Sequence, residues 1–238
     1  MEEATREIIA IAPGDPLYPV NLGKISGKLR TLYALGNTAL LGETFAAAVV
    51  GTTTPSEAAK AACAETTSFL VEKGFVIVSG LAAGCDTIAH QSCLDAGGKT
   101  IAVLAHGLDI CYPRSNLNLR DAILEKGGLL LSEYPPGTKP RKNFFVARDR
   151  IQSGLSRGIV VIETDVTGGT MHTARFAEKQ KRLIGCIVSQ ARGNKELLKE
   201  NKALPLKTAM EKDTFIISMK ILDIKSHEPD KKSQMELF

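Results

Sequence analysis

Short apolar runs recur along this chain and alternate with longer segments of mixed polarity. The runs occupy residues 46–50, 75–78, 100–104, 128–131, 158–162 and 183–188. Runs of this length that are bounded by glycine or polar residues are typical of buried strands. Strands that alternate with helix-length segments predict an α/β fold with a mostly parallel, twisted sheet and helices on both of its faces.

Local signals mark where the intervening helices begin and end. Thr54-Pro55-Ser56-Glu57 has the form of a capping box with proline at the first helical position, which predicts a helix to about Lys73. Gly74 and Gly97-Gly98 follow expected helix ends, where glycine readily closes a helix. The other helices are expected at about 82–96, 116–125, 143–155 and 170–182.

The two ends of the chain lack this alternation. The first residues contain turn dipeptides such as Asp15-Pro16 and apolar residues such as Leu29, which we expect to cover part of the core. After Arg192 the pattern fades, and 226–234 has the composition of a solvated tail. We divide the chain into a lead-in packed on the core (1–45), a main α/β domain (46–204) and a C-terminal extension (205–238).

Three loops that follow expected strands are rich in glycine and hydroxyl residues. They are Gly51-Thr52-Thr53-Thr54, Ser79-Gly80-Leu81-Ala82 and Thr167-Gly168-Gly169-Thr170, and each precedes an expected helix. In a parallel sheet such loops leave from the same edge, where ligands of open α/β folds bind. Small residues let backbone N–H groups approach a ligand, and helix N-termini favour anions. The three loops together predict a site for a phosphate or another anion.

Charge is distributed unevenly along the chain. The 238 residues carry a net charge of only +4, but residues 139–157 hold six Lys or Arg against one acid, and residues 175–199 hold seven against two. Concentrated positive charge favours a polyanionic partner, although solvated helix faces produce such windows as well. No apolar run reaches the length of a membrane span, and Met1-Glu2-Glu3 is not typical of a signal peptide, so we expect a cytoplasmic protein with no membrane partner.

Several classes of site lack support in the sequence. The five cysteines are odd in number and form no C-x-x-C pair, so neither a disulfide framework nor a zinc site is expected. Neither G-x-G-x-x-G nor G-x-x-x-x-G-K-[ST] is present, which disfavours a dehydrogenase or a P-loop NTPase. Glu163 and Asp165 follow an expected strand and are candidate acids, but a role as loop or helix N-terminal acids is commoner.

Several segments form recognisable motifs in a fixed order. Residues Ser79 to His90 have the sequence S-G-L-A-A-G-C-D-T-I-A-H, and Gly169 to Ala174 have the sequence G-T-M-H-T-A. Between them lie Gly98–Val103, Gly107–Asp109, Tyr112–Asn116, Leu131–Gly137 and Asn143–Ser156. Together these segments resemble, in sequence and in order, the motifs of the DNA processing protein A family (DprA, also called Smf), over about residues 15–190.

The resemblance implies an extended Rossmann-like domain that binds single-stranded DNA as a homodimer. It also implies that the protein protects DNA in natural transformation and assists RecA loading in recombination, with no cofactor and no enzymatic turnover. The phosphate contacts expected by motif and chemistry are Gly51, Thr52, Thr53, Ser79, Gly80, Arg114, Asn116, Lys142, Arg148, Arg150, Gly168, Gly169 and Thr170. Arg114, at the family's basic position after Tyr-Pro, is the leading contact, whereas Arg148 and Arg150 are spaced so that both are not expected to face one phosphate. The aromatic residues available for base stacking are Tyr112, Tyr134, Phe144 and Phe145.

The sequence departs from the family's pattern at several positions. Thr53 stands where the first loop of the family commonly has Arg, and Asp149 replaces the Asn between Arg148 and Arg150, which adds negative charge beside the expected groove. No winged-helix domain is expected in residues 205–238. These departures favour weaker DNA binding or a different ligand.

Two alternatives to single-stranded DNA binding remain. One is a nucleotide-binding or nucleotide-hydrolysing protein of the related LOG-like group, although residues 166–170 lack the proline and second glycine of its loop, and no paired catalytic Arg and Glu is evident. The other is a structural homologue that binds no DNA and acts within a partner complex.

Overall fold

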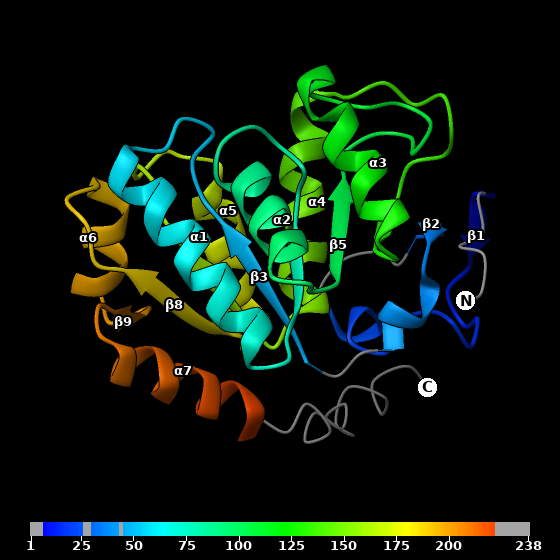
Figure 1. The fold of residues 1–238 in the computed structure, drawn as a ribbon. Coiled ribbons are helices and arrows are strands. Elements are labelled where there is room, and N and C mark those ends of the chain that lie inside the picture. The colour runs from blue at the N-terminus through cyan, green and yellow to red at the C-terminus, as the bar shows by residue number, and fades with distance from the viewer. Residues whose placement is uncertain (1–6, 26–29, 43–44, 222–238) are drawn as a thin grey trace.

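The computed structural model describes residues 7–25, 30–42 and 45–221, in which the strands form one nine-stranded sheet (Figure 1). The strands are β1 (Ile9–Ile11), β2 (Leu32–Gly36), β3 (Ala46–Val50), β4 (Val76–Ser79), β5 (Thr100–Leu104), β6 (Leu129–Ser132), β7 (Gly158–Val161), β8 (Leu183–Ile187) and β9 (Leu204–Leu206). Their order in the sheet is β1-β2-β6-β5-β4-β3-β7-β8-β9. All neighbours from β6 to β9 are parallel, whereas β1 and β2 are antiparallel.

Helices cover both faces of this sheet. They are α1 (Glu57–Glu72), α2 (Cys85–Asp95), α3 (Leu117–Glu125), α4 (Lys142–Leu155), α5 (Thr170–Lys179), α6 (Arg192–Lys199) and α7 (Ala209–Ile221), with short 3-10 helices at Leu22–Lys24, Thr38–Gly42 and Arg114–Asn116. Alternate residues of β3 point to opposite faces. Ala47 and Val49 pack in the core beneath α1, α2 and α7, whereas Ala48 and Val50 pack in the core beneath α4 and α5. The expected α/β class, with a mostly parallel sheet, is confirmed.

The main differences from the sequence-based expectations lie at the two ends. The lead-in supplies β1 and β2, which extend the sheet beyond β6; their short apolar stretches lie at an antiparallel edge and carry little periodic signal. Beyond Arg192, where the pattern fades, the chain still forms α6, β9 and α7. Phe215 of α7 is nearly fully buried against the sheet, so tertiary packing maintains this helix. Leu29 and residues 226–234 lie outside the described residues.

The order of the strands creates a topological switch point beside β3. From β3 the chain proceeds through β4, β5 and β6 in one direction, and then returns by way of α4 to β7 on the other side of β3. The helices that follow β3 and β7 therefore lie on opposite faces of the sheet. The loop after β3 and the loop after β7 run in opposite directions to reach these helices. Ligands of such folds bind at the carboxyl edge of the strands near this point. The loops after β3, β4 and β7 leave three adjacent strands of this edge.

Candidate nucleic-acid interface

The three glycine- and hydroxyl-rich loops leave adjacent strands at the carboxyl edge of the sheet, and the loop after β3 is bonded to the connections that follow β4 and β7. The amide of Thr52 donates to the carbonyl of Glu163 (2.8 Å), which ties the loop after β3 to the loop after β7. The amide of Cys85 donates to the carbonyl of Thr52 (3.1 Å), which ties the same loop to the start of α2. Gly84 has a φ of +76°, and a Cβ there would collide with the Thr52 carbonyl oxygen. This close approach of two loops requires glycine.

The turn after β4 is held from both sides by buried charges. The Asp86 carboxylate accepts hydrogen bonds from the amides of Gly80 (3.1 Å) and Ala82 (3.3 Å). The Arg148 guanidinium, which reaches across from α4, donates to the carbonyl oxygens of Gly80 (2.7 Å) and Val103 (2.5 Å). A Cβ at Gly80 would overlap the Arg148 guanidinium. The turn is therefore rigid before any ligand arrives.

The structure separates the expected phosphate contacts by exposure. Thr53, Arg114, Lys142 and Gly169 are exposed; Gly51, Thr52, Arg150 and Gly168 are half-buried; Ser79, Gly80, Asn116, Arg148 and Thr170 are buried.

Four of these residues use their side chains to hold the fold, which corrects the expectation that they contact phosphate. The Ser79 hydroxyl donates to the Val49 carbonyl (2.8 Å), and Arg148 is bonded as described above. Asn116 donates from Nδ2 to the carbonyls of Leu81 and Ala82 and to the Thr87 hydroxyl. Arg150 forms an ion pair with the buried carboxylate of Glu133. Ser79, Asn116 and Arg148 are thus buried with their side chains bonded inside the protein, whereas Arg150 is half-buried with one guanidinium nitrogen bonded to Glu133.

Asp149 lies inside the protein and not beside an open groove. Its carboxylate accepts from Arg148 Nε at 3.2 Å, with side-chain exposures of 11% and 6% respectively. Burial raises the pKa of Asp149 to about 7, and the nearby Asp86 carboxylate adds to the rise, while Arg148 and a hydrogen bond with Thr173 oppose it. Burial likewise raises the pKa of Asp86. One guanidinium thus faces two carboxyl groups beneath the Gly80 turn.

The N-termini of the helices along this edge differ in charge. Glu163 accepts from the amide and hydroxyl of Ser56 at the start of α1, and Asp86 lies in the first turn of α2. Carboxylates therefore already occupy the positive ends of α1 and α2. The first turns of α3, α4 and α5 contain no acidic residue. Electrostatics consequently favours a bound anion near α3, α4 and α5, and the interpretation of Glu163 as a helix N-terminal acid is confirmed.

Exposed cations gather where α3 and α4 begin. This basic rim consists of Arg114, in the 3-10 helix before α3, and Lys139, Arg141 and Lys142, at and before the start of α4. Within the described part of the chain, the side chains of Arg114, Lys139 and Lys142 make no hydrogen bond or ion pair. These three side chains could bind a phosphate in place of water and counterions, because no contact within the protein would have to break first.

Aromatic rings lie next to the basic rim. The rings of Tyr134 and Phe144 stack with centroids 4.0 Å apart, and Tyr112 and Phe145 lie 5.8 Å apart in a tilted arrangement. Arg141 lies over the Phe144 ring at 5.5 Å. Tyr112 is 51% exposed, whereas Tyr134 is buried. Of these four aromatic rings, Tyr112 therefore has the most exposed surface on which a base could stack. Tyr134 is packed in the interior.

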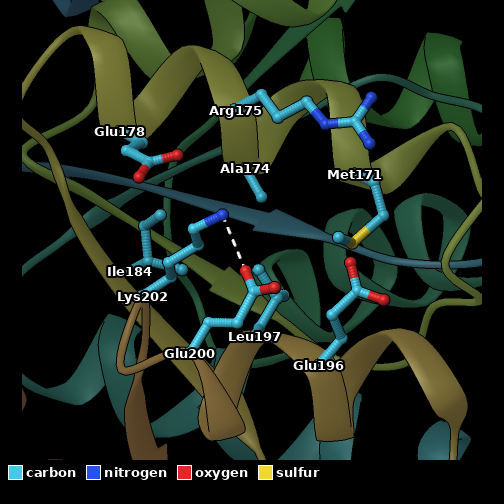
Figure 2. A pocket seen from close by; sticks show the side chains of 9 residues that line it. All are labelled: Met171, Ala174, Arg175, Glu178, Ile184, Glu196, Leu197, Glu200 and Lys202. Atoms are coloured by element: carbon cyan, nitrogen blue, oxygen red, sulfur yellow. Dashed lines mark ion pairs between the residues drawn. The ribbon is translucent and has the colours of Figure 1, made fainter.

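A separate cavity of about 100 Å³ lies between α5 and α6 (Figure 2). Met171, Ala174, Ile184 and Leu197 form its apolar lining, and Lys202 forms an ion pair with Glu200 at 2.7 Å. Glu178, Glu196 and Arg175 complete the charged rim. Acidic side chains outnumber basic ones here, so this cavity does not favour a phosphate.

The described residues form neither a metal-binding cluster nor a helix that could span a membrane. No cluster of His, Cys, Asp or Glu in them is arranged to hold a metal ion. None of their helices is both long and apolar enough to cross a membrane.

The sequence and the fold of this chain are both similar to those of known proteins. The family model described as DNA recombination-mediator protein A matches residues 9–216. Protein Smf of Synechocystis is 39% identical over 210 residues, which are 82% of this chain and 52% of that protein, so the chain spans about half the length of this relative.

Solved structures agree with the family match. DNA processing protein A from Streptococcus pneumoniae has a TM-score of 0.78 and 35% identity, covering 87% of this chain and 73% of the other. DNA processing protein A from Helicobacter pylori has a TM-score of 0.75 and 30% identity, covering 85% and 92%. With the matched family model and this shared fold, the chain belongs to the DNA recombination-mediator protein A family, which includes the DprA and Smf proteins.

Proposed function

We propose that this protein binds single-stranded DNA at the carboxyl edge of its sheet and acts in DNA processing during DNA uptake and recombination. The observation that carries the proposal is the basic rim of Arg114, Lys139, Arg141 and Lys142 beside the exposed ring of Tyr112. Cations neutralise the phosphates of a strand, and aromatic faces stack its bases without regard to sequence. The Helicobacter pylori relative has a described single-stranded DNA binding mode.

The proposed path of the strand follows from the charges along the edge. The starts of α3 and α4 offer cations and helix N-termini that no acid occupies, whereas Glu163 and Asp86 occupy those of α1 and α2. Thr53 is exposed beside α1 and supplies no cation. We therefore place the phosphates over the basic rim, with Gly168 and Gly169 at the start of α5 as the next contact. Gly51 and Thr52 contribute by shaping the edge.

A salt titration tests the proposal directly. Binding of the chain to a fluorescent single-stranded oligomer and to its duplex is measured by anisotropy between 50 and 300 mM salt, values that we choose as the test range. We expect tighter binding to the single strand and a linear fall of log K with log salt, with a slope of about −0.7 for each phosphate neutralised. Absent binding, or equal binding to both forms, would contradict the proposal and favour a role without DNA.

Protection of DNA in natural transformation, loading of a RecA-type recombinase, dimer formation and a cytoplasmic location remain parts of the proposal. A strand-exchange assay with DNA coated by single-strand binding protein tests the loading step, and sedimentation of the purified chain tests the dimer. If the rate of strand exchange by the recombinase does not change when this protein is added, the proposed role in recombinase loading is wrong.

We propose no enzymatic turnover. Arg150 and Glu133 do form an Arg–Glu pair, but the Glu133 carboxylate is 3% exposed and the two groups are bonded to each other. A LOG-like hydrolase would need such groups open to a nucleotide, so this pair does not support the alternative. Release of free base from nucleoside monophosphates by the purified protein would reverse this conclusion.

A further inference from the structure

An open groove of about 400 Å³ lies between α2 and α3, next to the basic rim. Side chains of both helices line it, chiefly Ile88, Gln91 and Ser92 from α2, Ser115 from the 3-10 helix, and Asn118 and Leu119 from α3. Both helices begin at the carboxyl edge of the sheet, so the groove opens toward the proposed path of the strand.

The lining of the groove combines an apolar floor with neutral polar walls. Leu119 is 8% exposed, and Ile88 packs against the core beneath α1 and α2. The side chains of Ser92, Ser115 and Asn118 make no hydrogen bond within the described part of the chain. These hydroxyl and amide groups offer both donors and acceptors, whereas the floor offers dispersion contact. A flat heteroaromatic molecule with polar edges matches this combination.

The charges around the groove indicate which part of a nucleotide would lie inside it and which part would lie at its entrance. Arg114 precedes Ser115 at the entrance and is exposed and unpaired within the described residues. One turn beyond the groove, Asp95 accepts a hydrogen bond from Gln91 Nε2 at 2.8 Å. A phosphate backbone that ran along the groove would approach this carboxylate, whereas a neutral base that entered from the Arg114 side would not. The phosphate thus stays at the rim and the base points inward.

The groove is also braced before a ligand arrives. Asn116 Nδ2 donates to the Thr87 hydroxyl at 2.8 Å and to the Leu81 carbonyl at 3.0 Å, which joins the start of α3 to α2 and to the turn after β4. The Thr87 hydroxyl donates in turn to the Ala82 carbonyl at 2.8 Å. A preformed groove reduces the ordering that binding requires.

From this geometry we propose that the groove between α2 and α3 binds one unstacked nucleobase of the single strand whose adjacent phosphate contacts Arg114. The inference rests on the proposed DNA-binding function and deepens it. Asn118, Ser92 and Ser115 contact the polar edge of the base, and its faces lie against Ile88 and Leu119.

The test separates base contacts from phosphate contacts. Asn118→Ala and Ser92→Ala remove neutral groups from exposed or half-exposed positions, so each is expected to weaken binding of a single-stranded oligomer about two- to tenfold, the range of one or two hydrogen bonds. The slope of log K against log salt should stay that of the wild type, because no phosphate contact is lost. Arg114→Ala is the matched comparison and should reduce the slope.

An abasic scan of the oligomer supplies the second readout. A single abasic residue moved along the strand should weaken wild-type binding at one position, and Asn118→Ala should add no further loss at that position while adding its full loss elsewhere. A uniform abasic profile, or unchanged DNA affinity in both groove variants, overturns the inference. If the wild type still shows salt-dependent binding in that case, the proposed function stands alone. If the wild type does not bind single-stranded DNA, both the proposed function and the proposed base site are contradicted.

Discussion

The Glu163 carboxylate accepts two hydrogen bonds from Ser56, one from its amide at 2.8 Å and one from its hydroxyl at 2.9 Å. Ser56 is the N-cap residue of α1, and its hydroxyl also accepts from the Ala59 amide at 3.2 Å. The carboxylate therefore lies at the positive end of α1, where a phosphate would otherwise be favoured. An internal carboxylate thus already occupies one helix N-terminus of the edge.

Glu163→Gln should tighten binding of single-stranded DNA at low salt. The amide keeps the shape of the side chain but removes one negative charge from the end of α1, a position where a charge contributes about 0.3–1 kcal/mol. We expect a two- to fivefold gain in affinity by anisotropy. Glu72→Gln is the matched control, since Glu72 is exposed at the opposite end of α1, away from the carboxyl edge of the sheet. Equal gains in the two variants would indicate a general charge effect.

Arg114→Ala should weaken DNA binding for all sequences alike. Arg114 is exposed and unpaired within the described chain, so its loss removes a phosphate contact without disturbing the fold. On a single strand the magnitude of the salt slope should fall by about 0.7, the contribution of one phosphate contact. Lys199→Ala, at the exposed far end of α6, removes the same charge at a distance and should leave the slope unchanged. A slope that does not change in Arg114→Ala would exclude Arg114 as a contact.

The Arg148→Ala variant should have a lower free energy of unfolding than the wild type. Its guanidinium holds the carbonyls of Gly80 and Val103 and faces the buried carboxyl groups of Asp86 and Asp149. Removal of one partner of a buried charge pair costs about 3–5 kcal/mol. Urea denaturation at pH 8 should show this loss, whereas Arg141→Ala, at the exposed N-cap of α4, should change the free energy of unfolding by less than about 0.5 kcal/mol. Comparable small losses in both would mean that Arg148 is not a structural residue.

Asp149→Asn should change how stability depends on pH. Because burial raises the pKa of Asp149 to about 7 in the folded protein, the folded state holds its proton more tightly than the unfolded state, where the pKa is about 3.9. The contribution of this proton to stability is complete below pH ~4 and is lost as the pH rises through about 7. The variant should therefore be more stable than the wild type at pH 8, by up to roughly 4 kcal/mol for a difference of about three pKa units, and nearly equal to it at pH 4.

Urea denaturation of both proteins at several values of pH measures this difference. Asp165→Asn serves as the control because Asp165 is exposed, and its profile should run parallel to that of the wild type. A difference between Asp149→Asn and the wild type that does not vary with pH would show that folding does not change the pKa of Asp149.

The central strands and the glycine-rich loops at their carboxyl edge could be predicted from local patterns of residues. The strand at 158–162 and the loop at 51–54 are local features, since apolar runs, glycine turns and caps act over a few neighbouring residues. For the same reason the ends of the chain were missed. The strands β1 and β2 and the helices α6 and α7 form through contacts with the sheet, and isolated short segments carry little signal of their own.

Which polar residues of the edge are exposed depends on packing between elements that are distant in the sequence. In the sequence, Arg114 and Arg148 are both arginines within family motifs. In the fold, α4 directs Arg148 inward, where carbonyl oxygens and two carboxyl groups compensate its buried charge, while the 3-10 helix before α3 leaves Arg114 in solvent. A buried charge must be bonded within the protein, whereas an exposed one stays free for DNA. That distinction depends on burial, which no local motif specifies.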